Sequence, residues 1–272
     1  MTAEVVPAKV QQKKAVLAPS SARKALQILF AFSEQRHEAT VAELAILIDS
    51  PVPTVYRHVA LLKELQLLEE GQAAKYHPTA RVMPLARAAQ LSNDMARIAK
   101  PVVTEAAELL NETVMLMQYF GDSVVCVERQ ECDRPMRFTF QPGHSIPLGV
   151  GASGRMALAS LPEADRTRRI SELAGPLEST VDALTAEAEA TMRRQYAVST
   201  SEVDDGVWAC SVPLTVRKER PVVLTVAGPV SRIDDAAQER ALVTLQHSAT
   251  RIRDEFDKYA LCLPPRRRDW PG

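Results

Sequence analysis

The stretch Pro147-Leu-Gly-Val-Gly-Ala-Ser-Gly-Arg-Met-Ala-Leu-Ala-Ser160 places three of the ten glycines of the chain at the start of a run that favours a short helix. These glycines have the G-x-G-x-x-G spacing of a dinucleotide-binding loop. Such a loop also needs a strand leading directly into its first glycine and a long helix after its third. Pro142 and Pro147 interrupt the approach, and Pro162 ends the helix early. We therefore predict a loop and a short helix here, without a dinucleotide.

Small residues at a helix start leave backbone N–H groups accessible, which suits the carboxylate or phosphate of a small ligand. A tight turn with a purely structural role is the alternative. A catalytic use is less well supported, because Arg155 stands where a G-x-S-x-G nucleophile elbow around Ser153 needs glycine. The alternative is an enzyme, a hydrolase or acyl transferase that uses Ser153 or Cys210 beside His144.

The composition sets limits on the possible partners. The chain has 272 residues, 46% hydrophobic and 25% charged, with a net charge of -1, as expected of a globular protein with a sizeable core. This charge gives no global attraction to nucleic acid or membranes. No apolar run approaches the roughly 18 residues of a membrane span, and the four cysteines lack zinc-site spacing. We expect a cytoplasmic protein with no membrane, metal or cofactor.

The first part of the chain has the pattern of a winged helix-turn-helix over residues 20–83, after a flexible basic arm at 1–19. Apolar residues recur every three or four positions in 20–35, 40–49 and 52–67, which predicts three helices. Thr40 and Glu43 have the spacing of a capping box at the second helix. Ser50-Pro51-Val52-Pro53 breaks the second helix from the third. Residues 67–77 then predict a hairpin, the wing, that turns at 71–74.

The third helix carries the candidate contacts to DNA. Its N-terminal polar residues lie off the apolar stripe in our prediction and point to solvent, where they can reach base edges or phosphates. Residues 20–83 contain seven basic and seven acidic residues, a balance less basic than most DNA-binding modules. A winged protein-interaction domain is therefore the alternative. The predicted DNA-binding residues are Thr54, Tyr56, Arg57, His58, Lys63 and Lys75.

The rest of the chain predicts an α+β domain. A linker helix at 84–98 is expected to meet a second helix at Pro101, and the second domain follows over 99–260. The tail, 261–272, is expected to be disordered. Strands are predicted at 113–120, 123–130, 136–140, 196–202, 207–216 and 221–226, and helices at 154–160, 163–173, 180–195 and 234–259.

Several stretches together resemble one family. The glycine loop resembles the segment that opens the effector pocket of isocitrate-lyase-regulator (IclR) type transcription factors, and so do 196–202, 206–213 and 227–233. Pro53-Thr-Val-Tyr-Arg57 resembles the recognition helix of that family. The resemblance covers about 20–259 and implies a winged helix, a linker helix and a GAF-like effector domain. It also implies a regulator or repressor that binds double-stranded DNA at two half-sites as a homodimer or a dimer of dimers.

The resemblance also implies which residues bind the small-molecule effector. The chain departs from the family at Gln66 and Thr79, where glycines are usual, and at Ser199, where an acidic residue is usual. Short apolar positions edged by hydroxyls favour a small, partly apolar organic acid. The implied effector-binding residues are Leu148, Ala152, Ser153, Ser199, Val207, Ala209, Thr225 and Ala227.

Overall fold

The computed structural model describes residues 20–33, 36–135, 137–214 and 220–262. The expected basic arm at 1–19 and positions 263–272 of the expected tail lie outside these residues. The chain divides between Ala86 and Arg87 into two compact units, which are described separately below.

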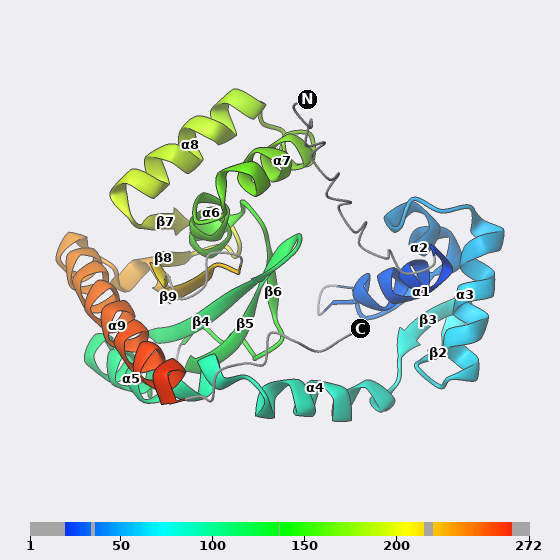
Figure 1. Ribbon diagram of the computed structural model, residues 1–272, viewed down its shortest axis with the longest axis horizontal. Helices are drawn as coiled ribbons and strands as arrows, with labels where there is room; N and C mark the ends of the chain where they lie inside the picture. Colours follow the sequence, from blue (N-terminus) through cyan, green and yellow to red (C-terminus); the bar gives the residue numbers. More distant parts are fainter. Residues whose placement is uncertain (1–19, 34–35, 136, 215–219, 263–272) are drawn as a thin grey trace, which may run out of the picture. The chain divides into compact units, whose positions relative to one another are not determined.

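The first unit is a winged helix-turn-helix, as predicted (Figure 1). Three helices pack together through a core centred on Ile28, Leu44 and Val55. A three-stranded sheet of order β1-β3-β2 completes the unit, with a short 3-10 turn, Gln72–Ala74, at the tip of the wing. The elements are α1 (Ser20–Phe30), β1 (Ala39–Thr40), α2 (Val41–Leu47), α3 (Val52–Glu64), β2 (Leu68–Glu70) and β3 (Lys75–Pro78).

The local sequence sets the turn between α2 and α3. The predicted capping box is confirmed at the start of α2: the Glu43 N–H donates to Thr40 Oγ1 at 3.2 Å, and the Thr40 N–H donates to Glu43 Oε2 at 2.7 Å. The Ser50 N–H donates to the Ala45 carbonyl at 2.9 Å after α2 has ended. Pro51 and Pro53 then stand at the cap and in the first turn of α3, where prolines are tolerated. These contacts fix where α3 begins.

The chain between 80 and 110 differs from the prediction. A 3-10 turn (Ala80–Val82) leads into α4 (Met83–Leu91), and α5 (Asp94–Leu110) follows after a break of two residues. The predicted junction at Pro101 is wrong, and the expected linker helix ends before residue 98. Asn93 caps α5 by accepting a hydrogen bond from the Ala96 N–H at 3.2 Å, so a side-chain cap and not the proline sets the boundary. Pro101 lies inside α5 on its exposed side, so the carbonyl that loses its donor is open to solvent.

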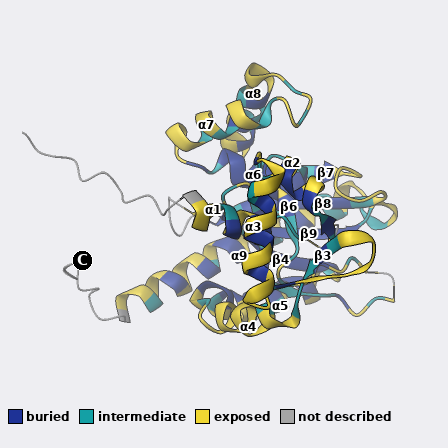
Figure 2. Ribbon diagram, turned by 90° about the vertical axis from the view of Figure 1, so that its right-hand side faces the viewer, coloured by how far each residue is buried: buried dark blue, intermediate teal, exposed yellow. Residues whose placement is uncertain are grey.

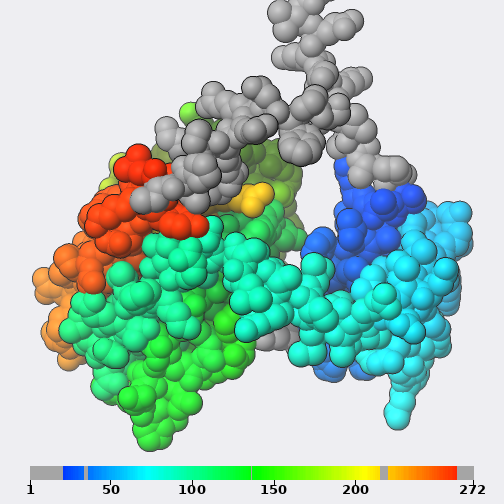
Figure 3. Space-filling model, turned by 60° about the horizontal axis from the view of Figure 1, so that its bottom comes forward, coloured from blue at the N-terminus to red at the C-terminus, as the bar shows by residue number. Residues whose placement is uncertain are grey.

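The second unit has the predicted α+β fold, built on one antiparallel sheet of order β6-β5-β4-β9-β8-β7. Helices α5 and α9 lie side by side on one face, whereas α6 packs against the other face, with α7 and α8 beyond it (Figures 1 and 3). The strands are β4 (Thr113–Phe120), β5 (Ser123–Gln130), β6 (Ser145–Pro147), β7 (Ala197–Thr200), β8 (Val207–Leu214) and β9 (Val222–Pro229). The remaining helices are α6 (Gly151–Ala159), α7 (Glu163–Leu173), α8 (Val181–Arg194), the 3-10 turn Val230–Arg232 and α9 (Asp235–Cys262).

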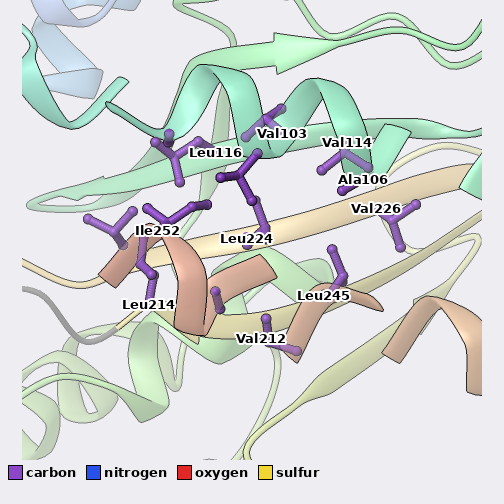
Figure 4. Close-up of a cluster of buried hydrophobic side chains, with 14 of the residues drawn as sticks. Val103, Ala106, Val114, Leu116, Val212, Leu214, Leu224, Val226, Leu245 and Ile252 are labelled. Atoms are coloured by element: carbon purple, nitrogen blue, oxygen red, sulfur yellow. The ribbon is translucent and has the colours of Figure 1, made fainter. Parts of the chain in front are cut away.

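Alternation along the central strands sends side chains to two separate cores. Leu116, Leu224 and Val212 point toward α5 and α9, where they pack against Leu245 and Ile252 of α9 (Figure 4). The residues between them point to the α6 side. Figure 2 shows buried strands, while much of the outer surface of α7 and α8 is exposed. Both sheet faces are therefore covered, and the α6 face is the one that the glycine loop reaches.

Two predictions for this unit need correction. Residues 137–140 of the strand expected at 136–140 form no strand, and Met136 lies outside the described residues. The edge of β5 is occupied by the later segment instead, because β6 pairs with it from Ser123 to Val125 and the Cys126 N–H donates to the His144 carbonyl at 2.9 Å. The helix α9 includes Leu261 and Cys262, which were expected in the tail.

None of the helices that the structure describes is long and apolar enough to cross a membrane.

Candidate functional site

The glycine loop turns the chain from the sheet edge into α6. Gly149 and Gly151 have φ values of +84° and +61°, a backbone conformation that other residues rarely adopt. Gly154 is required for a different reason: a Cβ at this position would lie 2.5 Å from the Pro147 carbonyl oxygen. The glycines thus let the loop fold tightly against the first turn of the helix. The three-residue strand before it and the nine-residue helix after it match no dinucleotide-binding unit.

The start of α6 presents buried backbone donors. Val150 caps the helix without a side-chain hydrogen bond. The Ala152 N–H donates to Ser199 Oγ at 3.0 Å, and the Gly154 N–H donates to the Val150 carbonyl at 3.1 Å. Among the described residues, the N–H groups of Gly151 and Ser153 have no acceptor outside the helix. The positive end of the helix dipole therefore keeps two free donors next to the sheet.

Three buried hydroxyls form a closed ring beside these donors. Ser153 Oγ lies 2.9 Å from Thr225 Oγ1 and 3.3 Å from Ser211 Oγ, and the latter two oxygens are 2.7 Å apart. Ser211 and Thr225 are direct cross-strand partners on β8 and β9, so the sheet register brings them together. Each hydroxyl has one donor and two acceptor sites, so a ring of three bonds leaves acceptor capacity on every member.

A small pocket lies between α6 and the sheet, with a volume of about 20 Å³ for the centres of water-sized spheres. Seven of the eight implied effector-binding residues line it: Ala152, Ser153, Ser199, Val207, Ala209, Thr225 and Ala227. Leu148 does not line it, because its side chain is fully buried in the core beneath α6. Six lining residues were missed by the sequence analysis: Met115, Phe138, Phe140, Ile146, Val203 and Asp204.

The missed residues come from segments with no local signal for a pocket. Phe138 and Phe140 lie in the irregular segment after β5, where their rings are 4.7 Å apart. The Phe138 carbonyl accepts a hydrogen bond from Thr113 Oγ1 at 2.7 Å, which ties this segment to β4. Val203 and Asp204 lie in the β7–β8 loop. Their approach to the pocket depends on the sheet topology and not on any short-range pattern.

The arrangement does not support the catalytic alternative. Cys210 points toward α5 and α9, on the face of the sheet opposite to Ser153. Burial raises the pKa of its thiol to about 12, which keeps it protonated and poorly nucleophilic. The Ser153 hydroxyl is bonded to two other hydroxyls, and neither is a general base. Within the described part of the chain, no group of three or more His, Cys, Asp or Glu residues could hold a metal ion.

The candidate nucleic-acid interface is the outer face of α3 together with the wing. Tyr56 is 56% exposed, Arg57 is also exposed, and Thr54 is half-buried. Figure 2 shows the exposed side of α3. The two predicted lysines are ion-paired in the free protein. Lys63 lies 2.7 Å from Glu70, and Lys75 pairs with Glu38. A phosphate would therefore have to displace these carboxylates.

His58 corrects the predicted interface. It was expected to point to solvent, but only 8% of its surface is exposed. Position 58 follows Val55 by three residues and precedes Leu62 by four, so it belongs to the buried face of α3. Burial first, and then the charges of Arg57 and Lys24, lower its pKa. A buried imidazole held in the neutral form cannot reach a base edge, and His58 is better understood as a core residue of the winged helix.

Comparisons with known families account for both units. The IclR helix-turn-helix domain matches residues 21–71, and the C-terminal domain of the bacterial transcriptional regulator IclR matches residues 88–254. A probable transcriptional regulator, SauR of Cupriavidus necator, is 29% identical over 223 residues, which cover 79% of this chain and 88% of that protein. The regulator TtgV of Pseudomonas putida is 30% identical over 141 residues, which cover 52% of this chain and 54% of that protein.

Solved structures show the same fold. An IclR family transcriptional regulator from Brucella abortus has a TM-score of 0.77 at 19% identity, covering 94% of this chain and 97% of that one. An IclR homolog from Microbacterium hydrocarbonoxydans, complexed with 4-hydroxybenzoate, has a TM-score of 0.59 at 17% identity, covering 88% of this chain and 100% of that one.

Proposed function

Since this chain belongs to the IclR family of bacterial transcriptional regulators, we propose that it binds an operator through α3 and the wing and senses a small organic acid in the pocket beneath α6. Occupancy of the pocket changes operator affinity. The proposal rests on the pocket, in which Ala152 and Ser153 at the positive end of α6 meet walls made mostly of apolar residues. The matched families consist of regulators, so the hydrolase hypothesis is abandoned and the chain is not an enzyme.

The chemistry of the pocket supports an acid with an apolar body. A carboxylate placed at the start of α6 would accept a hydrogen bond from the Ser153 amide and gain from the helix dipole. The carbon skeleton would pack on Met115, Phe138 and Phe140. The 4-hydroxybenzoate held by the Microbacterium homolog is an acid of this kind. Seven of the residues assigned from the family resemblance line this pocket, and we propose them as effector contacts.

The exposed face of α3 supports the DNA-binding half of the proposal. Arg57 can reach a guanine edge or a phosphate, and Tyr56 and Thr54 can reach phosphates or a thymine methyl. The near-neutral charge of this unit predicts that one copy binds weakly. We therefore propose a homodimer or dimer of dimers on an operator with two half-sites. The exposed apolar residues of α4, Met83, Leu85 and Leu91, suit a contact with a second copy.

One gel-shift experiment tests both halves, with the DNA upstream of the protein's own gene and any acid from a panel that raises the unfolding temperature. Arg57→Ala should weaken binding by roughly tenfold or more, because a charged contact to a base or phosphate is lost. Arg36 is an exposed arginine outside α3 and the wing, so Arg36→Ala is the matched control.

Ala209→Leu should fill the pocket, leave DNA binding intact and abolish the response to the acid. Unchanged binding by Arg57→Ala would refute the role given to α3, and a surviving response in Ala209→Leu would refute the role of the pocket.

A further inference from the structure

The pocket beneath α6 has two chemically different ends. Its inner end lies at Ser153, whose N–H has no acceptor outside α6 and whose hydroxyl belongs to the buried ring. Its outer end is formed by the β7–β8 loop, whose Val203 is 38% exposed. The same loop lies over the helix start, because a Cβ on Gly151 would be 2.7 Å from Val203 Cγ2. A ligand with its carboxylate at the buried Ser153 therefore extends toward this loop at the mouth of the pocket.

Asp204 is the charged residue of the pocket. Of the thirteen residues that line it, none is Lys, Arg or His, and Asp204 alone carries a charge. The loop holds this residue in place: the Val207 N–H donates to the Asp204 carbonyl at 3.2 Å, and the Ser201 N–H donates to the Val207 carbonyl at 2.8 Å. Asp204 is exposed, and among the described residues the arginine on α6 nearest this loop, Arg155, pairs with Glu187 and Glu202 instead of Asp204. The outer end of the pocket thus presents an unneutralised negative charge.

The nearby arginine does not compensate this charge. Arg155 of α6 bonds to Glu187 at 2.9 Å, to the Val198 carbonyl at 3.0 Å and to Glu202 of the same loop. It also donates to the Gly151 carbonyl at 3.3 Å. Its guanidinium is therefore shared between two carboxylates on α8 and the loop. An added anion at the mouth would meet Asp204 without a free cation to balance it.

We propose that Asp204 is a specificity-determining residue, which selects organic acids that carry a hydrogen-bond donor at the end opposite their carboxylate and rejects those that carry a second anionic group there. This inference rests on the proposed function and deepens it. A hydroxyl or amino group donates to the free carboxylate of Asp204, and a charge-assisted hydrogen bond of this kind is stronger than a neutral one. A second carboxylate at the same place is repelled by the like charge of Asp204.

Three rigid acids of the same shape test the proposal: benzoate, 4-hydroxybenzoate and terephthalate, which differ only in the group opposite the carboxylate. Their dissociation constants are measured by isothermal titration on the full-length protein, with thermal shift as a second readout. The wild type should bind 4-hydroxybenzoate most tightly and terephthalate at least about tenfold more weakly. Asp204→Asn should reduce the ratio of the dissociation constants of terephthalate and 4-hydroxybenzoate by about tenfold. Asp205 does not line the pocket, so Asp205→Asn, which removes the neighbouring charge, should leave this ratio unchanged.

The outcomes separate this inference from the function on which it rests. If the acids bind but Asp204→Asn leaves the ratio of 4-hydroxybenzoate to terephthalate as in the wild type, the pocket stands and the role of Asp204 is wrong. The role of Asp204 is also wrong if Asp205→Asn changes this ratio as much as Asp204→Asn does. If none of the three acids binds to the wild type or to Asp204→Asn, the pocket does not take acids of this shape, and both the acid-sensing function and this inference fall.

Discussion

His58 is the residue whose environment most directly predicts a pH effect. Burial in α3 and the charges of Arg57 and Lys24 hold its pKa below the usual value of 6.5. As pH falls through 6.5, the unfolded chain binds a proton that the folded chain still excludes, so folding stability decreases. We expect the unfolding temperature of the first unit to fall between pH 7.5 and 5.5. His58→Gln should remove this part of the pH dependence in thermal unfolding scans.

The control for His58 is His37→Gln, because His37 is an exposed residue of the same unit. The unfolding temperature of the His37→Gln variant should depend on pH in the same way as that of the wild type. The pKa values of Glu38, Glu43 and Glu70 are also lowered, from 4.5, but they affect stability in a different pH range. The stability that these carboxylates contribute is lost as the pH falls below 4.5. A wild-type profile that is flat between pH 7.5 and 5.5 would contradict the buried, neutral assignment of His58.

Single residues also show where reading the sequence succeeds and fails. Val52, Val55, Val59, Leu62 and Leu65 were predicted as the apolar stripe of the third helix; the middle three are buried, whereas Val52 and Leu65 are 41% and 46% exposed. His58 has the same spacing, but its polar side chain suggested the surface, and the periodicity was the better guide. Nothing in the local sequence around Asp204 indicates a pocket residue, because its position depends on how β7 and β8 pair in the sheet.

At the scale of elements, the start of α6 depends on Gly154. A methyl group there would lie 2.5 Å from the Pro147 carbonyl oxygen and 3.1 Å from the Gly149 nitrogen, both backbone atoms that cannot move without shifting the loop. We expect Gly154→Ala to destabilise the second unit by about 1–3 kcal/mol in urea unfolding, as overpacking does. It should also weaken acid binding, because the donors of α6 move.

The matched control for this change is Gly175→Ala. No atom would lie within 4 Å of its new methyl group, and it does not have the positive φ that strains other residues. This substitution should be neutral or stabilise slightly, by up to about 1 kcal/mol. If the two variants lose the same stability, a clash between a Cβ at position 154 and the glycine loop is not the reason that position 154 is glycine.

The strands were predictable where apolar residues form a nearly continuous run. Strands were expected at 113–120 and 123–130, and β4 and β5 have these bounds. The errors fall where a tertiary contact or a cap decides. Asn93 caps α5 eight residues before the expected junction at Pro101, and the aromatic alternation of 137–140 packs beneath α6 without joining the sheet. Neither outcome follows from local periodicity.

For the whole molecule, the fold class and the pocket depend on contacts between distant segments. The hydroxyl ring joins Ser153 to residues 58 and 72 positions later in the chain. Composition and periodicity supply the helices and strands but not the order β6-β5-β4-β9-β8-β7 that brings these hydroxyls together. The family resemblance indicated seven residues of the pocket and missed six others, on β4, β6, the segment after β5 and the β7–β8 loop.

The separate cores of the two units predict independent unfolding. Leu44 and Leu245 are both fully buried, the first in the winged helix and the second between α9 and the sheet. Truncating either to alanine should cost about 2–5 kcal/mol through lost contacts and a cavity. In differential scanning calorimetry we expect two transitions. Leu44→Ala should lower only one of them, and Leu245→Ala only the other. Addition of 4-hydroxybenzoate should raise the transition lowered by Leu245→Ala, since a ligand stabilises the unit that binds it. A single transition that both variants lower equally would instead mean that the two units fold as one cooperative body.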